Sequence, residues 1–130
     1  MIKLQAESAQ EAFDKVVAHF RTNPGQCTTG YINMYTCQYR FMGNRCAIGV
    51  LIADLDYRST LEGRGVQTLI ENGDIERPHW DTMDFLMDLQ RLHDEKDHWG
   101  YDPETDACTM FVGWDAVDYF ANEYGLVFTP

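Results

Sequence analysis

The sequence predicts an α+β fold: a single mainly helical domain over residues 1–130, with about four helices and a small antiparallel sheet or hairpin. Apolar residues recur at helical spacing in several segments, and one aromatic stretch alternates as strands do. The chain has 130 residues, 45% of them hydrophobic and 13% aromatic, which is enough for a packed core without disulfides. No linker, repeat or low-complexity segment divides it.

The first helix is predicted to begin at Ser8. Ser8 and Glu11 match the S-x-x-E capping box, and an apolar stripe follows at Phe13, Val16, Val17 and Phe20. The sequence Asn-Pro-Gly at residues 23–25 should end this helix, because proline and glycine both interrupt helical hydrogen bonding.

A hairpin is predicted next. Residues 31–41 alternate and are rich in aromatics, and residues 42–44 supply a turn before residues 45–47. If Gly43 and Asn44 form a two-residue turn, Phe41 pairs with Cys46, although other registers are open. The short apolar run at residues 50–53 fits a buried helical turn or a strand equally well.

Three further helices are predicted. Residues 65–71 fit a brief helix followed by a left-handed Gly73. A longer helix starts at Asp81, with apolar residues from Phe85 to Leu92 on one face. The last helix has apolar residues at helical spacing from Trp114 to Tyr124, and Gly125-Leu126 fits a Schellman end. Residues 127–128 could add an edge strand, and residues 94–106 fit a solvated loop with Trp99 and Tyr101 against the core.

The negative charge is concentrated near the C-terminal end of the sequence. Residues 81–130 hold twelve Asp/Glu against Arg91 and Lys96, a net charge of −10, whereas residues 1–80 hold nine acidic and eight basic residues, a net charge of −1. Such a field repels nucleic acid and anionic membranes and attracts a basic protein surface. The candidate binding residues are Asp81, Asp84, Asp88, Asp94, Glu95, Asp97, Asp115 and Asp118.

Two explanations of these carboxylates compete. Neighbouring acidic residues on a helix lie roughly 5–6 Å apart, near the spacing of phosphates along a strand, so the acidic face could enter a nucleic-acid channel of a host or defence protein. Alternatively, the carboxylates only keep the helix faces soluble.

Three motifs carry a family resemblance: C-x-Y-R at residues 37–40, G-x-x-C-A-x-G-x-L-I at residues 43–52, and L-Q-x-x-H-D at residues 89–94. In this order, after an amphipathic helix, they resemble an uncharacterised family of small phage and prophage proteins. The similarity spans roughly residues 12–94. It implies a phage or mobile-element origin, assigns no activity, and directs attention to a set of motif residues. These are Cys37, Tyr39, Arg40, Cys46, Gly49, His93 and Asp94.

The same motifs allow an enzymatic alternative. Cys46 precedes a possible helix, whose N-terminus would favour the thiolate, and His93 oriented by Asp94 could serve as base, with Tyr39 or Arg40 holding the substrate. A hydrolase or transferase of the Cys/His type would use such groups. In the structural alternative, Cys46 packs in the core and His93 completes the apolar stripe of its helix. A third hypothesis is a structural or regulatory phage component that binds only itself.

Metal binding has weak support from spacing. Cys37, Cys46 and His93 are candidate zinc ligands, but the two cysteines are separated as C-x8-C rather than C-x2-C. Residues 95–100 fail the EF-hand pattern, because Trp99 would occupy a position that needs an oxygen ligand. We therefore predict no cofactor, free thiols and a cytoplasmic location, with the oligomeric state left open.

Overall fold

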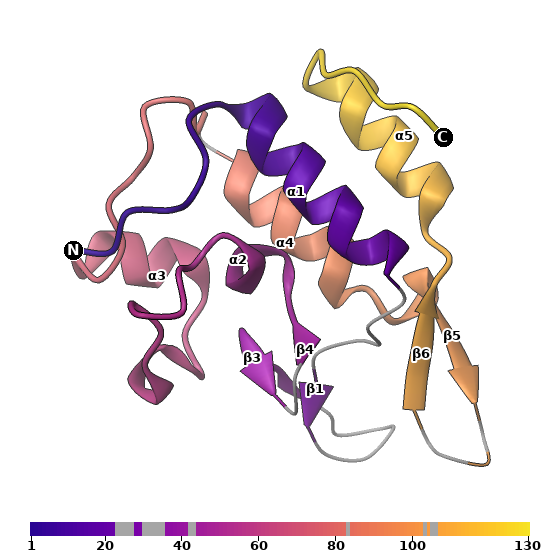
Figure 1. Ribbon diagram of the computed structural model, residues 1–130, viewed down its shortest axis with the longest axis horizontal. Helices are drawn as coiled ribbons and strands as arrows, with labels where there is room; N and C mark the ends of the chain where they lie inside the picture. Colours follow the sequence, from indigo (N-terminus) through magenta and orange to yellow (C-terminus); the bar gives the residue numbers. More distant parts are fainter. Residues whose placement is uncertain (23–27, 30–35, 42–43, 83, 103, 105–106) are drawn as a thin grey trace.

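The computed structural model describes residues 1–22, 28–29, 36–41, 44–82, 84–102, 104 and 107–130 (Figure 1). The predicted α+β class is confirmed: these residues contain five α-helices and three separate two-stranded antiparallel ladders. The helices are α1 (Ala9–Arg21), α2 (Ala47–Val50), α3 (Val66–Glu71), α4 (Phe85–Asp94) and α5 (Trp114–Glu123). Two 3₁₀ turns cover Ser59–Leu61 and Lys96–His98.

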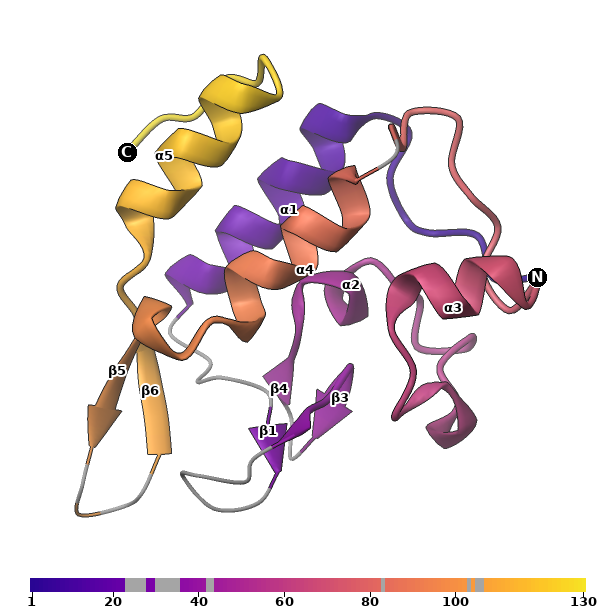
Figure 2. The same cartoon turned by 180° about the vertical axis from the view of Figure 1, so that it is seen from behind.

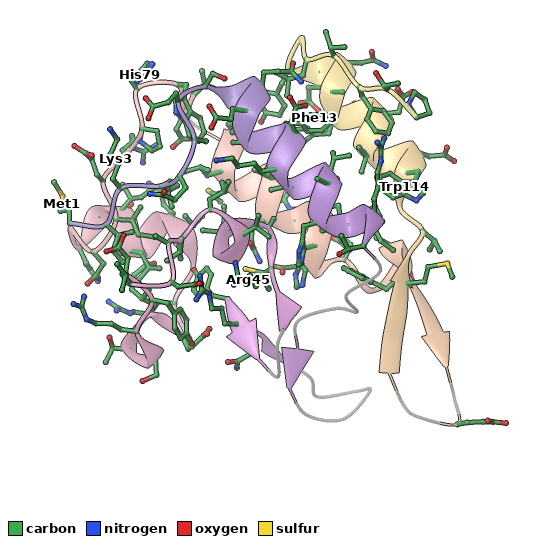
Figure 3. All side chains as sticks on the ribbon, in the orientation of Figure 1. Met1, Lys3, Phe13, Arg45, His79 and Trp114 are labelled. Atoms are coloured by element: carbon green, nitrogen blue, oxygen red, sulfur yellow. The ribbon has the colours of Figure 1, made fainter. Side chains whose placement is uncertain are left out.

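The three longest helices lie side by side and enclose the main core. From behind, α4 lies in front of α1, with α5 alongside both (Figure 2). Phe13 of α1 lies at the α5 side of its helix (Figure 3), where its ring stacks on Phe120 with centroids 5.7 Å apart. The one-turn helix α2 packs against both α1 and α4. No helix of the described residues is long and apolar enough to cross a membrane.

The local signals that begin α1 and end α5 work as predicted. The Ser8 hydroxyl accepts from the Glu11 amide at 3.1 Å, although the Glu11 carboxylate accepts from the Glu7 amide instead of that of Ser8. At the other end of the chain, Gly125 has φ +66° and the Leu126 amide donates to the Ala121 carbonyl at 2.8 Å. These are the backbone conformation and the hydrogen bond of a Schellman motif.

The predicted edge strand at residues 127–128 is wrong. The side chain of Gln10 makes both backbone hydrogen bonds of Val127, at 2.9 Å each, so this residue pairs with a glutamine of α1 rather than with a strand.

The hairpin prediction is confirmed for residues 40–41 and 44–45, with a different register, whereas its residues 31–35 and 42–43 lie outside the described part of the chain. β3 (Arg40–Phe41) pairs with β4 (Asn44–Arg45), so Phe41 lies opposite Asn44 and not opposite Cys46. The Cys46 amide instead donates to the Tyr39 carbonyl at 3.2 Å, because the chain turns into α2 directly after Cys46. β1 (Thr28–Thr29) pairs separately with β2 (Thr36–Cys37).

A third ladder replaces part of the predicted loop at residues 94–106. β5 (Trp99–Asp102) pairs with β6 (Ala107–Phe111). The expected packing of Trp99 in the core is confirmed: its side chain is 4% exposed and its Nε1 donates to the His93 carbonyl at 2.7 Å. The rings of Phe20 and Phe111 stack beside it with centroids 4.1 Å apart. This hairpin therefore closes the end of the core between α1 and α4.

Candidate functional site

The eight predicted binding carboxylates fall into different environments. Asp88 and Asp94 are half-buried, and the Asp81 side chain is only 2% exposed. The exposed residues are Asp84, Glu95, Asp97, Asp115 and Asp118.

Asp81 does not contribute to an anionic surface. One carboxylate oxygen lies 2.8 Å from the Arg77 guanidinium, and the other accepts from the Leu86 amide at 3.2 Å. Desolvation by burial raises the pKa of this carboxyl, partly opposed by the Leu86 amide and Arg77. Helix α4 begins at Phe85, four residues after the predicted start, and Asp81 caps its first turn from the preceding loop.

Asp88 joins α4 to the end of α5. Its carboxylate accepts from the Tyr124 hydroxyl at 2.5 Å and lies 3.4 Å from an Arg91 nitrogen on the same helix. The charge of Asp88 is therefore partly used to hold the two helices together.

A groove of about 450 Å³ lies between α4 and α5. We call it the α4–α5 groove. Its lining residues are Asp88, Arg91, Leu92, Glu95, His98, Ala116, Tyr119, Phe120 and Glu123. The lining holds the carboxylates of Asp88, Glu95 and Glu123 but only one guanidinium, that of Arg91. Tyr119 is 71% exposed beside the apolar residues Leu92, Ala116 and Phe120. Asp115 lies one helical turn before Tyr119, and Asp118 lies three residues after Asp115, so both extend the negative surface across the outside of α5.

The arginines of residues 1–80 pair mainly with carboxylates of the same part of the chain, so they do not neutralise the negative charge at the α4–α5 groove. Arg40 and Arg45 pair with Asp54, and Arg64 pairs with Asp74. Among the ion pairs of the described ranges, only that of Arg77 joins residues 1–80 to a carboxylate of residues 81–130. The imbalance seen in the sequence therefore persists at the α4–α5 groove.

The candidate nucleophile and base are both enclosed. Cys46 is 0% exposed, and its Sγ accepts from the Gly49 amide at 3.2 Å, so the thiol serves as the N-cap of α2. His93 is also 0% exposed, with Nδ1 2.8 Å from an Asp94 carboxylate oxygen. The His93–Asp94 contact was expected, but a substrate in solvent reaches neither Cys46 nor His93 in this conformation. The geometry favours the structural alternative.

Tyr39 and Arg40 are also held by internal contacts. The Tyr39 hydroxyl donates to the Arg64 carbonyl at 2.6 Å. Burial is the main cause that raises the pKa of Tyr39, and nearby acidic groups raise it further. Arg40 lies 2.8 Å from Asp54 and places its guanidinium 5.0 Å from the Tyr57 ring centroid. Glu62, which the sequence did not single out, accepts from the backbone amides of both Tyr39 and Arg40.

The three resemblance motifs meet around α2. Gln90 of α4 accepts from the Ile48 amide at 2.9 Å and donates to Asp94 at 2.8 Å. A Cβ at Gly49 would collide with the Tyr39 carbonyl. The described motif residues thus connect β3, α2 and α4 through packing and hydrogen bonds.

The zinc hypothesis receives no support from the part of the chain that the structure describes, where no group of three His, Cys, Asp or Glu side chains could hold a metal ion. The Cys37 side chain lies outside the described residues, although its backbone belongs to β2.

Sequence reasoning missed Tyr119 and Glu123, which line the groove. Their signal was the helical spacing of residues 116, 119, 120 and 123, which predicts one continuous face. In comparisons with known proteins, no family, no curated protein and no solved structure matched this chain.

Proposed function

We propose that this chain is a small acidic binding protein of phage type, which captures a basic surface of a host or defence protein in the α4–α5 groove. The supporting observation is the groove itself: a depression of about 450 Å³ that combines an apolar floor, an exposed tyrosine and a carboxylate excess. The resemblance of the three motifs to phage proteins supports a host or defence protein as the partner.

The positions of two groove carboxylates support a role in binding rather than in folding. Glu95 is the C-cap of α4, and Glu123 is the last residue of α5. A helix C-terminus carries partial negative charge, so an acidic residue there is unfavourable by about 0.3–1 kcal/mol. Both side chains are therefore placed where they cost stability, which is expected of residues retained for recognition.

The groove chemistry suits arginine-rich surfaces. Tyr119 offers an aromatic face for a guanidinium, an interaction worth about 0.5–1 kcal/mol at exposed sites. The surrounding carboxylates would accelerate association and orient the partner. Because Asp115 and Asp118 continue this charge along α5, a basic nucleic-acid channel is the form of partner that the surface fits best.

The test is binding to a basic partner isolated from bacterial lysate at low salt and then purified. Glu95→Gln with Glu123→Gln should weaken its affinity by at least about tenfold, or about 1.4 kcal/mol, and flatten its salt dependence, while raising thermal stability. Glu71→Gln with Glu76→Gln is the matched control. Both residues are exposed, and their substitution removes the same amount of charge at positions away from the groove.

Equal losses in the two double variants, or affinity unchanged over a salt series, would contradict the proposal. Competition by duplex DNA or RNA for the partner tests the narrower proposal that the chain mimics nucleic acid. A mimic and the nucleic acid exclude each other from one channel. Simultaneous binding would reject mimicry and leave the basic-surface proposal in place.

A further inference from the structure

Residues 127–130 follow α5 and lie beside it without belonging to a helix or a strand (Figures 1 and 2). We call them the 127–130 segment. In the described part of the chain their backbone makes no hydrogen bond to another backbone group, and two side chains of α1 hold it instead. Val127 is 73% exposed, and Thr129 and Pro130 are exposed as well. A segment attached by so few contacts belongs to the parts of a protein that open locally at low cost.

Gln10 of α1 binds the backbone of one residue of this segment. Its Nε2 donates to the Val127 carbonyl and its Oε1 accepts from the Val127 amide, both at 2.9 Å. Nε2 also donates to Asp14 at 2.8 Å, which orients the side-chain amide. Gln10 thus offers a passing chain the donor and the acceptor that a residue of an antiparallel strand would offer. Because the contact is made to backbone atoms, it does not depend on the side chain at position 127.

The next residue of the segment enters an aromatic site. The Phe128 ring lies edge-on to Phe13, with centroids 6.0 Å apart, and parallel to Trp114 at 6.2 Å. The guanidinium carbon of Arg21 lies 5.8 Å from the centroid of the same ring, and this guanidinium donates to the Thr129 carbonyl. Ring pairs and a cation near a ring both favour an aromatic occupant. This position therefore selects a side chain, whereas the preceding one selects only backbone.

The segment does not fill the surface on which it lies. A groove of about 620 Å³ stays open between the segment and one face of α1, which runs from Gln10 to Arg21. Ligand pockets measure about 300–1,000 Å³, so this space is large enough for further residues of a bound chain. Asp14 and Arg21 are exposed there, and neither has an ion-pair partner among the described residues. A longer chain that repeats the contacts of residues 127–129 can therefore gain contacts that the segment lacks.

We propose that this face of α1 binds an extended segment of a partner protein that carries an aromatic side chain, and that the 127–130 segment occupies the same site in cis. Gln10 binds the backbone of one residue of the partner, and Phe13 with Trp114 binds the aromatic side chain of the next. Arg21 donates to the carbonyl of the third. The site does not rest on the function proposed above, because none of these four residues lines the α4–α5 groove.

The test uses the peptide acetyl-Leu-Val-Phe-Thr-Pro-amide, which copies residues 126–130, and the ¹⁵N-labelled full chain with Phe128→Ala, which vacates the aromatic site. We expect saturable NMR shifts of the Gln10 side-chain amide and the Trp114 indole N–H, with a Kd on the order of 0.1 mM. The parent chain should bind about tenfold more weakly, since its own segment competes at an effective concentration on the order of 1 mM. This ratio keeps the segment docked roughly nine times in ten and leaves an open population that a partner can capture.

Two altered peptides test what the site recognises. Acetyl-Leu-Val-Ala-Thr-Pro-amide should give no saturable shift, because it lacks the ring. Acetyl-Leu-Thr-Phe-Thr-Pro-amide should bind with an unchanged Kd, because Gln10 contacts only backbone atoms at the altered position and the Val127 side chain is exposed. Equal affinity of the alanine peptide and the phenylalanine peptide would overturn the aromatic site.

A second substitution tests the glutamine. Gln10→Ala, added to Phe128→Ala, should weaken peptide binding about tenfold, because two hydrogen bonds to the ligand backbone are lost. Gln67→Ala in the same background is the matched control, since Gln67 lies on α3 and donates to Glu71 there. Circular dichroism checks that each variant is folded. Should Phe128→Ala fail to fold, titration of the parent chain to higher peptide concentration carries the test, because the same two resonances should shift.

Absence of saturable shifts at Gln10 and Trp114, or equal binding to the Gln10→Ala and Gln67→Ala chains, would overturn the proposal. Sedimentation of the parent chain over a concentration series tests the other occupant, which is the 127–130 segment of a second copy. We expect no dimer that depends on this segment. A dimer that forms with rising concentration and is abolished by Phe128→Ala would assign the site to exchange between copies and overturn a partner segment.

Discussion

The Tyr124 hydroxyl donates a 2.5 Å hydrogen bond to the carboxylate of Asp88, and this contact connects the last turn of α5 to the first turns of α4. It lies at one end of the α4–α5 groove, which Asp88 lines. The geometry of the proposed binding surface therefore depends on a pair that also contributes to folding.

Tyr124→Phe should lower the free energy of unfolding by about 1 kcal/mol, because a hydrogen bond to a charged acceptor is lost at a half-exposed site. Urea denaturation measures this difference. Tyr119→Phe is the matched control: its ring is 71% exposed, so loss of its hydroxyl should leave stability unchanged. Equal effects of the two substitutions would show that the Tyr124–Asp88 contact contributes nothing.

Arg77→Gln should destabilise the fold by about 2 kcal/mol, because it leaves the desolvated Asp81 carboxylate without its cation. In an Asp81→Asn background the same substitution should cost much less, since no buried charge remains to be compensated. A double-mutant cycle measured by urea denaturation gives the coupling. Additive effects would mean that Arg77 and Asp81 do not stabilise one another.

The elements predicted best from sequence are those with local signals. The N-cap at Ser8 and the Schellman end at Gly125 each depend on residues within a few positions, so both were identified correctly, although Glu11 accepts from Glu7 rather than completing the capping box. The ladder of β5 and β6 was missed because Trp99 also packs against Phe20 of α1, a contact between residues distant in sequence that no local pattern reveals.

The candidate site was only partly predictable for the same reason. The sequence revealed the excess of carboxylates but not which ones are buried. Asp81 and Asp84 look equivalent along the chain, yet packing encloses the first and leaves the second exposed. Likewise, the hollow of about 230 Å³ lined by Tyr39, Arg64 and Gln90 forms from three segments whose proximity only the folded chain defines.

The stability of the protein should fall as pH rises above about 10. Burial first, and then nearby acidic groups, raise the pKa of Tyr39 above its ordinary 10.0. Below that pH both folded and unfolded chains keep the proton. Above it the unfolded chain releases the proton more readily, so ionisation favours unfolding, by at most about 1.4 kcal/mol per pH unit.

Urea denaturation between about pH 9 and 11, with Tyr39→Phe for comparison, isolates this effect. The variant loses the hydrogen bond to the Arg64 carbonyl and should be less stable at every pH, but its stability should decline less steeply. The pKa of Tyr124 is also raised, but Tyr124 is present in both the parent chain and the Tyr39→Phe variant, so it contributes equally to the two slopes. Identical slopes would contradict the assignment to Tyr39.

Gly49→Ala should be the most damaging small substitution in the described part of the fold. Gly49 belongs to α2, and a Cβ there would overlap the backbone carbonyl of Tyr39, which cannot move as a side chain tip can. That carbonyl also accepts from the Cys46 amide, so displacing it would break the link between β3 and α2. We expect a loss of about 3 kcal/mol or more.

Gly65→Ala is the matched control for this prediction, because the added Cβ meets no atom within 4 Å and φ is already compatible with alanine. As the N-cap of α3 it should cost no more than about 1 kcal/mol. Thermal melts of both variants against the parent chain give the comparison. Should Gly49→Ala melt within a few degrees of Gly65→Ala, the glycine in the G-x-x-C-A-x-G motif would not be explained by its approach to Tyr39, and a role beyond packing would have to be sought for it.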